Sequence, residues 1–301
     1  MIEKPLLGAS LYVPATHPDV GAIAAGEKLA SLQSIIFCLE DAVSDAEFPR
    51  AFENMRAALR RLRRREGFWR FVRVRHPENM AMVLRLEGVE ALDGFVLPKA
   101  TQRNMDDYMR LLPADMPYWV MPTLETREVF QDAAMHAFAA YLEGAPWRQR
   151  IACLRIGGND LLALLHMRRP RGRTAYETPL GSVIARLAGA FIPAGFALSA
   201  PVFEHLEDVQ TLRREVQADL AHGLSGKSAV HPQQVAHIER LYRVPHADIE
   251  AAQRIVCADA PGVFALHRSM CEPATHRAWA VTVLAAARRF GCVEPHGTQH
   301  E

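Results

Sequence analysis

The sequence contains few cysteines and no cysteine motif. Five occur in 301 residues, an odd number, and no two of them are spaced as in a CxxC motif. This usage argues against a zinc centre or a disulfide framework. It is typical of small buried thiols in a reducing compartment, so we expect a cytoplasmic protein.

An excess of one charge and a long apolar run are also absent. The 35 Lys and Arg nearly cancel the 34 Asp and Glu, which leaves a net charge of +1. This balance argues against a broad nucleic-acid-binding surface. No apolar run approaches the roughly 20 residues of a membrane span, and the N-terminus has no signal-peptide pattern. We therefore expect neither a nucleic acid nor a membrane as a partner.

Half of the residues are hydrophobic, enough for a sizeable core in two ordinary domains or one barrel-sized domain. Short apolar runs alternate with longer amphipathic ones. The apolar runs predict strands at 10–15, 35–40, 71–75, 94–99, 118–125, 151–156, 196–202 and 227–231. The amphipathic runs predict helices at 19–32, 46–64, 78–87, 102–112, 127–143, 160–166, 180–192, 206–222 and 232–242.

Eight repeats of strand and helix, with continuous apolar strands, favour a parallel sheet covered on both faces. Eight units close a (β/α)8 TIM barrel, which we place at residues 1–243. A doubly wound open sheet is the alternative, but no GxGxxG motif follows the first strand. Residues 244–301 form a C-terminal helical extension, with helices at 247–259 and 277–290, that we expect to pack on a neighbouring subunit.

Two acids stand at the ends of neighbouring predicted strands. Glu125 ends the fifth strand, and Asp160 follows the two glycines, Gly157 and Gly158, at which the sixth strand stops. Functional residues of a TIM barrel lie at this end of the strands. Asp160 alone could equally cap a helix. As a pair, the acids favour ligation of Mg²⁺, which prefers a few carboxylates plus water and substrate oxygens; Mn²⁺ is the alternative.

Other predicted strand ends are charged as well. Arg73 has apolar neighbours, and we interpret it as a clamp for a substrate carboxylate or as a structural ion pair with Glu40 or Asp41. Asp41 could orient metal-bound water. Lys99 is a candidate for substrate binding, although we favour an ion pair with a neighbouring acid.

Seven motifs, in register over about three quarters of the chain, resemble the HpcH/HpaI aldolase and citrate lyase β-subunit superfamily. They are Tyr12-Val13-Pro14-Ala15, Leu39-Glu40-Asp41-Ala42-Val43, Val72-Arg73-Val74-Arg75, Leu97-Pro98-Lys99, Leu124-Glu125-Thr126, Ile156-Gly157-Gly158-Asn159-Asp160-Leu161 and Gly226-Lys227-Ser228-Ala229-Val230-His231-Pro232-Gln233-Gln234.

The resemblance implies a TIM barrel that binds Mg²⁺ through Glu125 and Asp160. It implies cleavage or formation of a carbon–carbon bond beside a carboxylate or thioester, with the metal and Arg73 stabilising an enolate. It also implies a homo-oligomer, a trimer or hexamer, in which an acid from a neighbour's C-terminal segment covers the site. Glu272, in Met270-Cys271-Glu272-Pro273, is the local match for that acid.

Some residues depart from the superfamily pattern. Arg75 stands where Asn is usual, and Asn159 where Glu is usual. A loop with four arginines is either solvated or a clamp for phosphates, of a CoA-like carrier or of a phosphorylated substrate; it holds Arg168, Arg169, Arg171 and Arg173. With its neighbouring motifs, this loop is similar to the branch encoded with bacterial tellurium-resistance clusters.

We therefore predict a Mg²⁺-dependent carbon–carbon lyase or aldolase that acts on a carboxylate-bearing substrate, CoA-linked or phosphorylated. Its substrate-binding set comprises Arg73, Arg75, Lys99, Gly157, Gly158, Asn159 and the four loop arginines; Glu40, Asp41 and Glu272 join Arg73 in the catalytic set. The alternative is a barrel that has lost catalysis and serves as a metabolite-binding or assembly module.

Overall fold

The computed structural model describes residues 4–29 and 31–293. Contacts between residues divide the chain into two compact units, Met1–Ile238 and Glu239–Glu301. We call them the barrel unit and the C-terminal unit. The division falls slightly before the position expected from the sequence, within the last helix of the barrel repeat.

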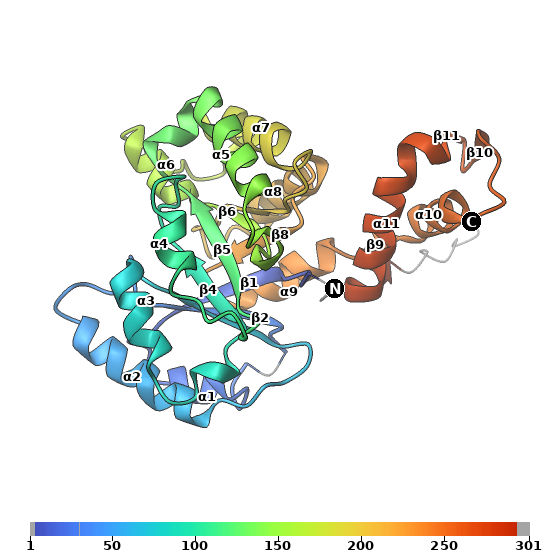
Figure 1. Cartoon of the computed structure of the whole chain (residues 1–301). Helices are drawn as coiled ribbons and strands as arrows, with labels where there is room; N and C mark the ends of the chain where they lie inside the picture. Colours follow the sequence, from blue (N-terminus) through green and yellow to red (C-terminus); the bar gives the residue numbers. More distant parts are fainter. Residues whose placement is uncertain (1–3, 30, 294–301) are drawn as a thin grey trace. The chain divides into compact units, whose positions relative to one another are not determined.

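Eight parallel strands close into a barrel in chain order, which confirms the predicted TIM barrel (Figure 1). The eighth strand pairs with the first, so that the sheet has no free edge. The strands are β1 (Gly8–Pro14), β2 (Ser34–Cys38), β3 (Trp69–Arg73), β4 (Gly94–Leu97), β5 (Trp119–Leu124), β6 (Leu154–Ile156), β7 (Leu198–Ala200) and β8 (Gly226–Ala229).

Helices follow the strands, as the amphipathic runs predicted. They are α1 (Val20–Ala24), α2 (Phe48–Arg61), α3 (Pro77–Leu84), α4 (Met105–Met109), α5 (Asp132–Gly144), α6 (Gly158–Leu164), α7 (Leu180–Phe191), α8 (Val209–Ala221) and α9 (Pro232–Leu241). The predicted helix at 19–32 is much shorter, because Gly26 takes a φ of +75° just after it. Glycine in this conformation commonly ends a helix.

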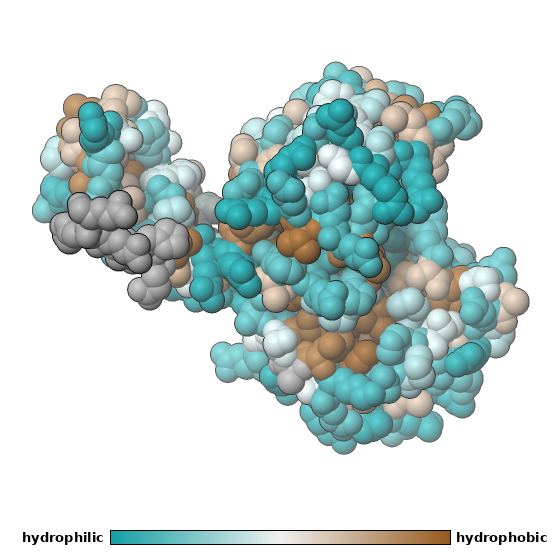
Figure 2. All heavy atoms as spheres, turned by 180° about the vertical axis from the view of Figure 1, so that it is seen from behind, coloured by the Kyte–Doolittle hydropathy of each residue, from teal (hydrophilic) through white to brown (hydrophobic). Residues whose placement is uncertain are grey.

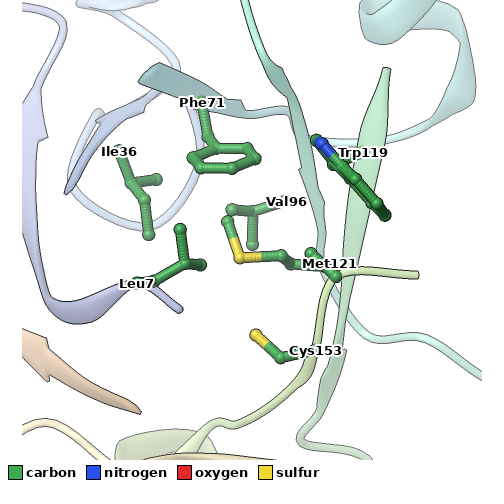
Figure 3. Packing of buried hydrophobic residues seen from close by; sticks show 8 residues of the cluster. Leu7, Ile36, Phe71, Val96, Trp119, Met121 and Cys153 are labelled. Atoms are coloured by element: carbon green, nitrogen blue, oxygen red, sulfur yellow. The ribbon is translucent and has the colours of Figure 1, made fainter. Parts of the chain in front are cut away.

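Side chains alternate along each strand between the barrel interior and the surrounding helices. Figure 3 shows apolar side chains from several strands that point toward one another and fill the interior. This cluster comprises Leu7, Ile36, Phe71, Val96, Trp119, Met121, Ala152 and Cys153. Two residues further along the strands, toward their carboxyl ends, the same face carries polar side chains, namely Arg73, Thr123 and Arg155. The barrel is therefore packed and apolar at one end and polar at the other.

The C-terminal unit is built on two helices, α10 (His246–Val256) and α11 (Pro273–Phe290), around a small apolar core. Residues 269–271 form β11 (Ser269–Cys271), which pairs with β10 (Phe264–Leu266). Two further short strands, β9 (Val244–Pro245) and β12 (Cys292–Val293), pair with each other. Apolar residues also reach the surface of this unit (Figure 2), among them Val263, Met270, Trp279 and Val281. No described helix is both long and apolar enough to cross a membrane.

Candidate active site

A cavity of about 460 Å³ opens at the carboxyl ends of the barrel strands. Both predicted metal ligands, Glu125 and Asp160, line it. The other lining residues come from six strands and the loops that follow them, and include Tyr12, Asp41, Arg73, Thr123, Arg155, Gly157, Gly158, Asn159 and Ser228. The structure therefore brings together most of the strand-end residues that the sequence singled out.

Glu125 follows β5 and is almost fully buried. Its Oε1 accepts hydrogen bonds from the backbone N–H of Lys99, at 2.8 Å, and from Nη2 of Arg73, at 3.2 Å. A Cβ at Gly157 would lie 2.2 Å from Oε2 of Glu125, so only glycine leaves room for this carboxylate. Burial raises the pKa of Glu125 to about 7, against the opposing charge of Arg73 and with a further contribution from Asp160.

Asp160 lies in the first turn of α6. The N-cap position of this helix is Gly157, so Asp160 does not take the N-cap role that was its alternative interpretation. Burial raises the pKa of Asp160, and the negative charge of Asp41 raises it further. In the metal-free protein, both predicted metal ligands are therefore acids whose ionised form is disfavoured.

Arg73 lies among carboxylates. Its Nη2 is 2.7 Å from Glu40 Oε2, 2.9 Å from Asp41 Oδ2 and 3.2 Å from Glu125 Oε1. The structural ion pairs considered for Arg73 are therefore present. These contacts hold the three carboxylates in place. Only Nη2 makes them, and Arg73 also lines the cavity, so its role as a clamp for a substrate carboxylate stays a prediction.

Lys99 makes the ion pair that was favoured for it. Its Nζ lies 2.6 Å from Glu40 Oε1 and 3.6 Å from Asp41 Oδ1. Lys99 has a φ of +49°, a strained conformation for a residue other than glycine. This conformation accompanies the backbone hydrogen bond that Lys99 donates to Glu125. Strain of this kind is typical of functional sites.

Arg75 does not bind in the cavity, contrary to the prediction. Its Nε donates to the Leu39 carbonyl at 2.7 Å, its Nη2 donates to the Val43 carbonyl, and it forms an ion pair with Asp45. Its guanidinium also lies over the ring of Phe48, 4.7 Å from the centroid. Arg75 therefore fastens the loop between β2 and α2.

The four loop arginines separate into two kinds. Arg169 is 3% exposed, donates to Glu204 Oε2 and the Val202 carbonyl at 2.8 Å each, and forms an ion pair with Glu215. Its nitrogens are occupied, so the prediction that it binds phosphate is wrong. Arg173 is exposed and pairs with Glu177.

Arg168 and Arg171 are exposed and form no ion pair with any described residue. They line a second cavity, of about 620 Å³, together with residues 204–208. Only these two arginines are left as candidates for the predicted phosphate clamp. Binding of phosphate by them stays a prediction.

Glu272 belongs to the C-terminal unit and precedes α11. Its side chain accepts a hydrogen bond from the Thr275 hydroxyl at 2.7 Å. The role expected for Glu272 concerns a neighbouring subunit and stays a prediction.

Sequence reasoning missed Arg155 on the floor of the cavity. Arg155 is 1% exposed, and its Nη2 donates to the Ser228 hydroxyl at 2.7 Å. Thr123, its register partner on β5, points to the same interior face. The sequence could have indicated this position. Arg155 is two residues from Cys153 and from Gly157, and side chains two residues apart on a strand point to the same face.

Among the residues that the structure describes, no group of three or more His, Cys, Asp or Glu side chains could hold a metal ion. A metal held by the two carboxylates of Glu125 and Asp160 would not be in a closed, all-protein cage. Such a site suits Mg²⁺, which commonly takes one or two carboxylates and keeps positions for water and substrate oxygens.

Comparison with known proteins agrees with this geometry. A model of the carbon–carbon bond lyases of the TIM-barrel fold matches residues 1–292. The chain belongs to this family. A (3S)-malyl-CoA thioesterase of Cereibacter sphaeroides is 29% identical over 252 residues, 82% of this chain and 81% of the relative. A citrate lyase subunit beta-like protein of Mycobacterium tuberculosis is 29% identical over 282 residues, 87% of this chain and 89% of the relative.

Solved structures show the same fold. The CitE protein of Mycobacterium tuberculosis, in complex with magnesium, acetoacetate and coenzyme A, aligns with a TM-score of 0.67 at 23% identity. The alignment covers 93% of this chain and 98% of that protein. RipC of Yersinia pestis aligns with a TM-score of 0.62 at 23% identity, over 82% of this chain and 100% of that protein.

Proposed function

We propose that this family member is a Mg²⁺-dependent carbon–carbon lyase or aldolase acting on a carboxylate-bearing substrate. The observation that carries the proposal is the placement of Glu125 and Asp160 in one cavity at the carboxyl ends of β5 and β6. Gly157, whose missing side chain leaves space for the Glu125 carboxylate, supports it. The relatives named for citrate lyase and malyl-CoA chemistry support the same class of substrate.

The charges around the cavity fit a divalent cation. Four carboxylates lie there, from Glu40, Asp41, Glu125 and Asp160. Arg73 and Lys99 pair with them, and Arg155 also lines the cavity, which leaves one net negative charge when all the acids are ionised. Burial is the main cause of the raised pKa values of Glu125 and Asp160, and neighbouring carboxylates add to it. A bound Mg²⁺ would favour the ionised form of both acids.

Mg²⁺ would supply Lewis-acid polarisation of the keto or hydroxy acid portion of a substrate. The chain's own residues set the geometry around it. Arg73 and the backbone N–H of Lys99 fix the orientation of the Glu125 carboxylate. Asp41, whose side chain is half exposed and lines the cavity, is the acid best placed to orient a water molecule or accept a proton from substrate.

Three further points extend the proposal. We infer that Arg168 and Arg171 would contact the phosphates of a CoA-linked substrate. Thioester hydrolysis is a second candidate activity, favoured by the similarity to the (3S)-malyl-CoA thioesterase. A homo-oligomer in the cytoplasm, with the C-terminal unit of one subunit packed on its neighbour, would cover the apolar side chains that this unit exposes.

Calorimetric titration of Mg²⁺ into metal-stripped protein tests the proposal. We expect binding to the wild type and none to Glu125→Gln, with the fold of the variant checked by circular dichroism. Glu128→Gln, three residues along the chain, is the matched control because Glu128 lies outside the cavity. Equal binding to the wild type and to Glu125→Gln would refute the metal site. A folded wild type that does not bind Mg²⁺ would favour the non-catalytic module.

A further inference from the structure

Arg155 is a buried cation without an acidic partner. It lies on β6, its side chain is 1% exposed, and it lines the floor of the candidate active site. No carboxylate of the described residues lies within 4.0 Å of its guanidinium. Arg73, in the same cavity, has three carboxylates within this distance.

The contacts of Arg155 are with neutral groups. Nη2 donates to the Ser228 hydroxyl at 2.7 Å, Nη1 lies 3.6 Å from the sulfur of Met121, and the guanidinium lies 5.4 Å from the centroid of the Tyr12 ring. Nε is buried without a hydrogen-bond partner. The hydroxyl of Thr123 is likewise buried and unpartnered. Two polar groups on neighbouring strands, both from residues that line the cavity, therefore have no hydrogen-bond partner among the described residues. Nε of Arg73, which also lines the cavity, is buried without a partner as well.

A guanidinium cannot lose its proton to escape this environment. Burial of a charge without a counter-charge is unfavourable, and buried structural cations are therefore paired. The same chain illustrates the rule, because Arg169 and Lys227 are as deeply buried and each has acidic partners. Arg155 is an exception to this pairing, and it lines a cavity that a ligand can enter.

We propose that Arg155, with Thr123 and Ser228, forms a subsite for a second carboxylate of the substrate. This inference rests on the proposed function, in which Glu125 and Asp160 hold the metal that receives the keto or hydroxy acid end. The substrate class is then a dicarboxylic acid or its derivative. The planar guanidinium of Arg155 matches the two oxygens of a carboxylate, and its single positive charge matches the single negative charge of that group, whereas a phosphate carries more.

Three stable hydroxy acids separate these classes, since they share one end and differ in the group at the other. Lactate ends in a methyl group, malate in a carboxylate and 3-phosphoglycerate in a phosphate. Each is titrated calorimetrically into the Mg²⁺-loaded wild type and into Arg155→Met. We expect malate to bind the wild type at least tenfold more tightly than lactate, and Arg155→Met to lose this preference while it keeps its lactate affinity.

Ser228→Ala should weaken malate binding several-fold, because Ser228 accepts a hydrogen bond from Arg155 and holds it in place. Arg213→Met is the matched control. Arg213 is an exposed residue of α8 outside the cavity, and its replacement removes the same charge. This control should leave the preference for malate unchanged.

Equal affinities for lactate and malate, or a preference for malate that survives in Arg155→Met, would overturn the subsite. Tighter binding of 3-phosphoglycerate, lost in Arg155→Met, would overturn the carboxylate assignment and identify a phosphate. Lactate binding that does not depend on Mg²⁺ would count against the metal site alone. In that case, loss of malate binding in Arg155→Met would still support the subsite.

Thermal unfolding distinguishes this role from a structural one. If Arg155 awaits a ligand, Arg155→Met removes an uncompensated charge and should leave the melting temperature of the ligand-free protein unchanged or raised. A marked fall would show that Arg155 is structural and would overturn the proposal. Arg155→Lys, which keeps the charge but not the planar fork, should retain part of the malate preference.

Discussion

Binding of Mg²⁺ should depend on pH because Glu125 must lose a proton to become a ligand. Burial raises the pKa of Glu125 to about 7 in the metal-free protein, against an ordinary value of 4.5. About one tenth of the molecules would have Glu125 ionised at pH 6, and about nine tenths at pH 8. The apparent affinity scales with this fraction, so it should fall about tenfold from pH 8 to pH 6.

The assay is isothermal titration calorimetry of Mg²⁺ in pairs of buffers that differ in ionisation enthalpy. The difference in heat between the paired buffers gives the number of protons released per Mg²⁺ bound. We expect about 0.9 proton at pH 6 and about 0.1 at pH 8. Asp160, whose pKa is also raised, can only steepen this dependence.

Stability of the metal-free protein should change in the opposite sense. A carboxyl whose pKa is raised by folding stays protonated in the native state after it has ionised in the unfolded chain. Stability is therefore lost as the pH rises from 4.5 to about 7, by at most about 3 kcal/mol for Glu125. Saturating Mg²⁺ should reduce this loss. An affinity that is flat between pH 6 and pH 8, with no proton release, would refute the assignment of Glu125 as a ligand.

Three further predictions concern single residues. Gly157→Ala should abolish Mg²⁺ binding in calorimetry, because its Cβ would lie 2.2 Å from Glu125 Oε2, while Gly144→Ala, with open space around it, should not. Lys227→Met leaves Glu215 and Asp219 buried without their lysine and should cost about 3–5 kcal/mol in urea unfolding, against less than about 0.5 kcal/mol for Arg213→Met. Arg75→Met should cost about 1–2 kcal/mol but leave the affinity of the Mg²⁺-loaded protein for malate unchanged; a weakened malate affinity would restore its predicted role in substrate binding.

The barrel and its two acids could be predicted because the information is local. Each buried parallel strand is a short apolar run, and in a barrel the residue after the run must lie at the rim. Glu125 and Asp160 both follow such runs, so their presence in one cavity needed no knowledge of distant contacts. Helix lengths were less predictable, as the short α1 shows, because a single glycine conformation ended the helix.

Roles that depend on distant partners could not be predicted. In the sequence, Arg169 resembles the three other arginines of its loop. Its acidic partners, Glu204 and Glu215, lie 35 and 46 residues further along the chain. Arg75 has the same parity as Arg73, which suggests that both face the interior. The strand ends at Arg73, however, so alternation no longer applies to Arg75, and its side chain turns to the following loop.

Two deeply buried arginines of this chain show how pairing separates a structural role from a functional one. Arg169 sits outside the strands of the barrel with Glu204 and Glu215, and its charge is balanced within the fold. Arg155 sits inside the barrel with hydroxyl, thioether and aromatic neighbours, and no carboxylate of the described residues lies within 4.0 Å of its guanidinium. The arrangement at Arg169 needs no ligand, because its buried charge is paired within the fold. In the proposed subsite, an anion that enters the cavity would pair with Arg155, and binding of substrate would thereby offset the cost of burying this charge.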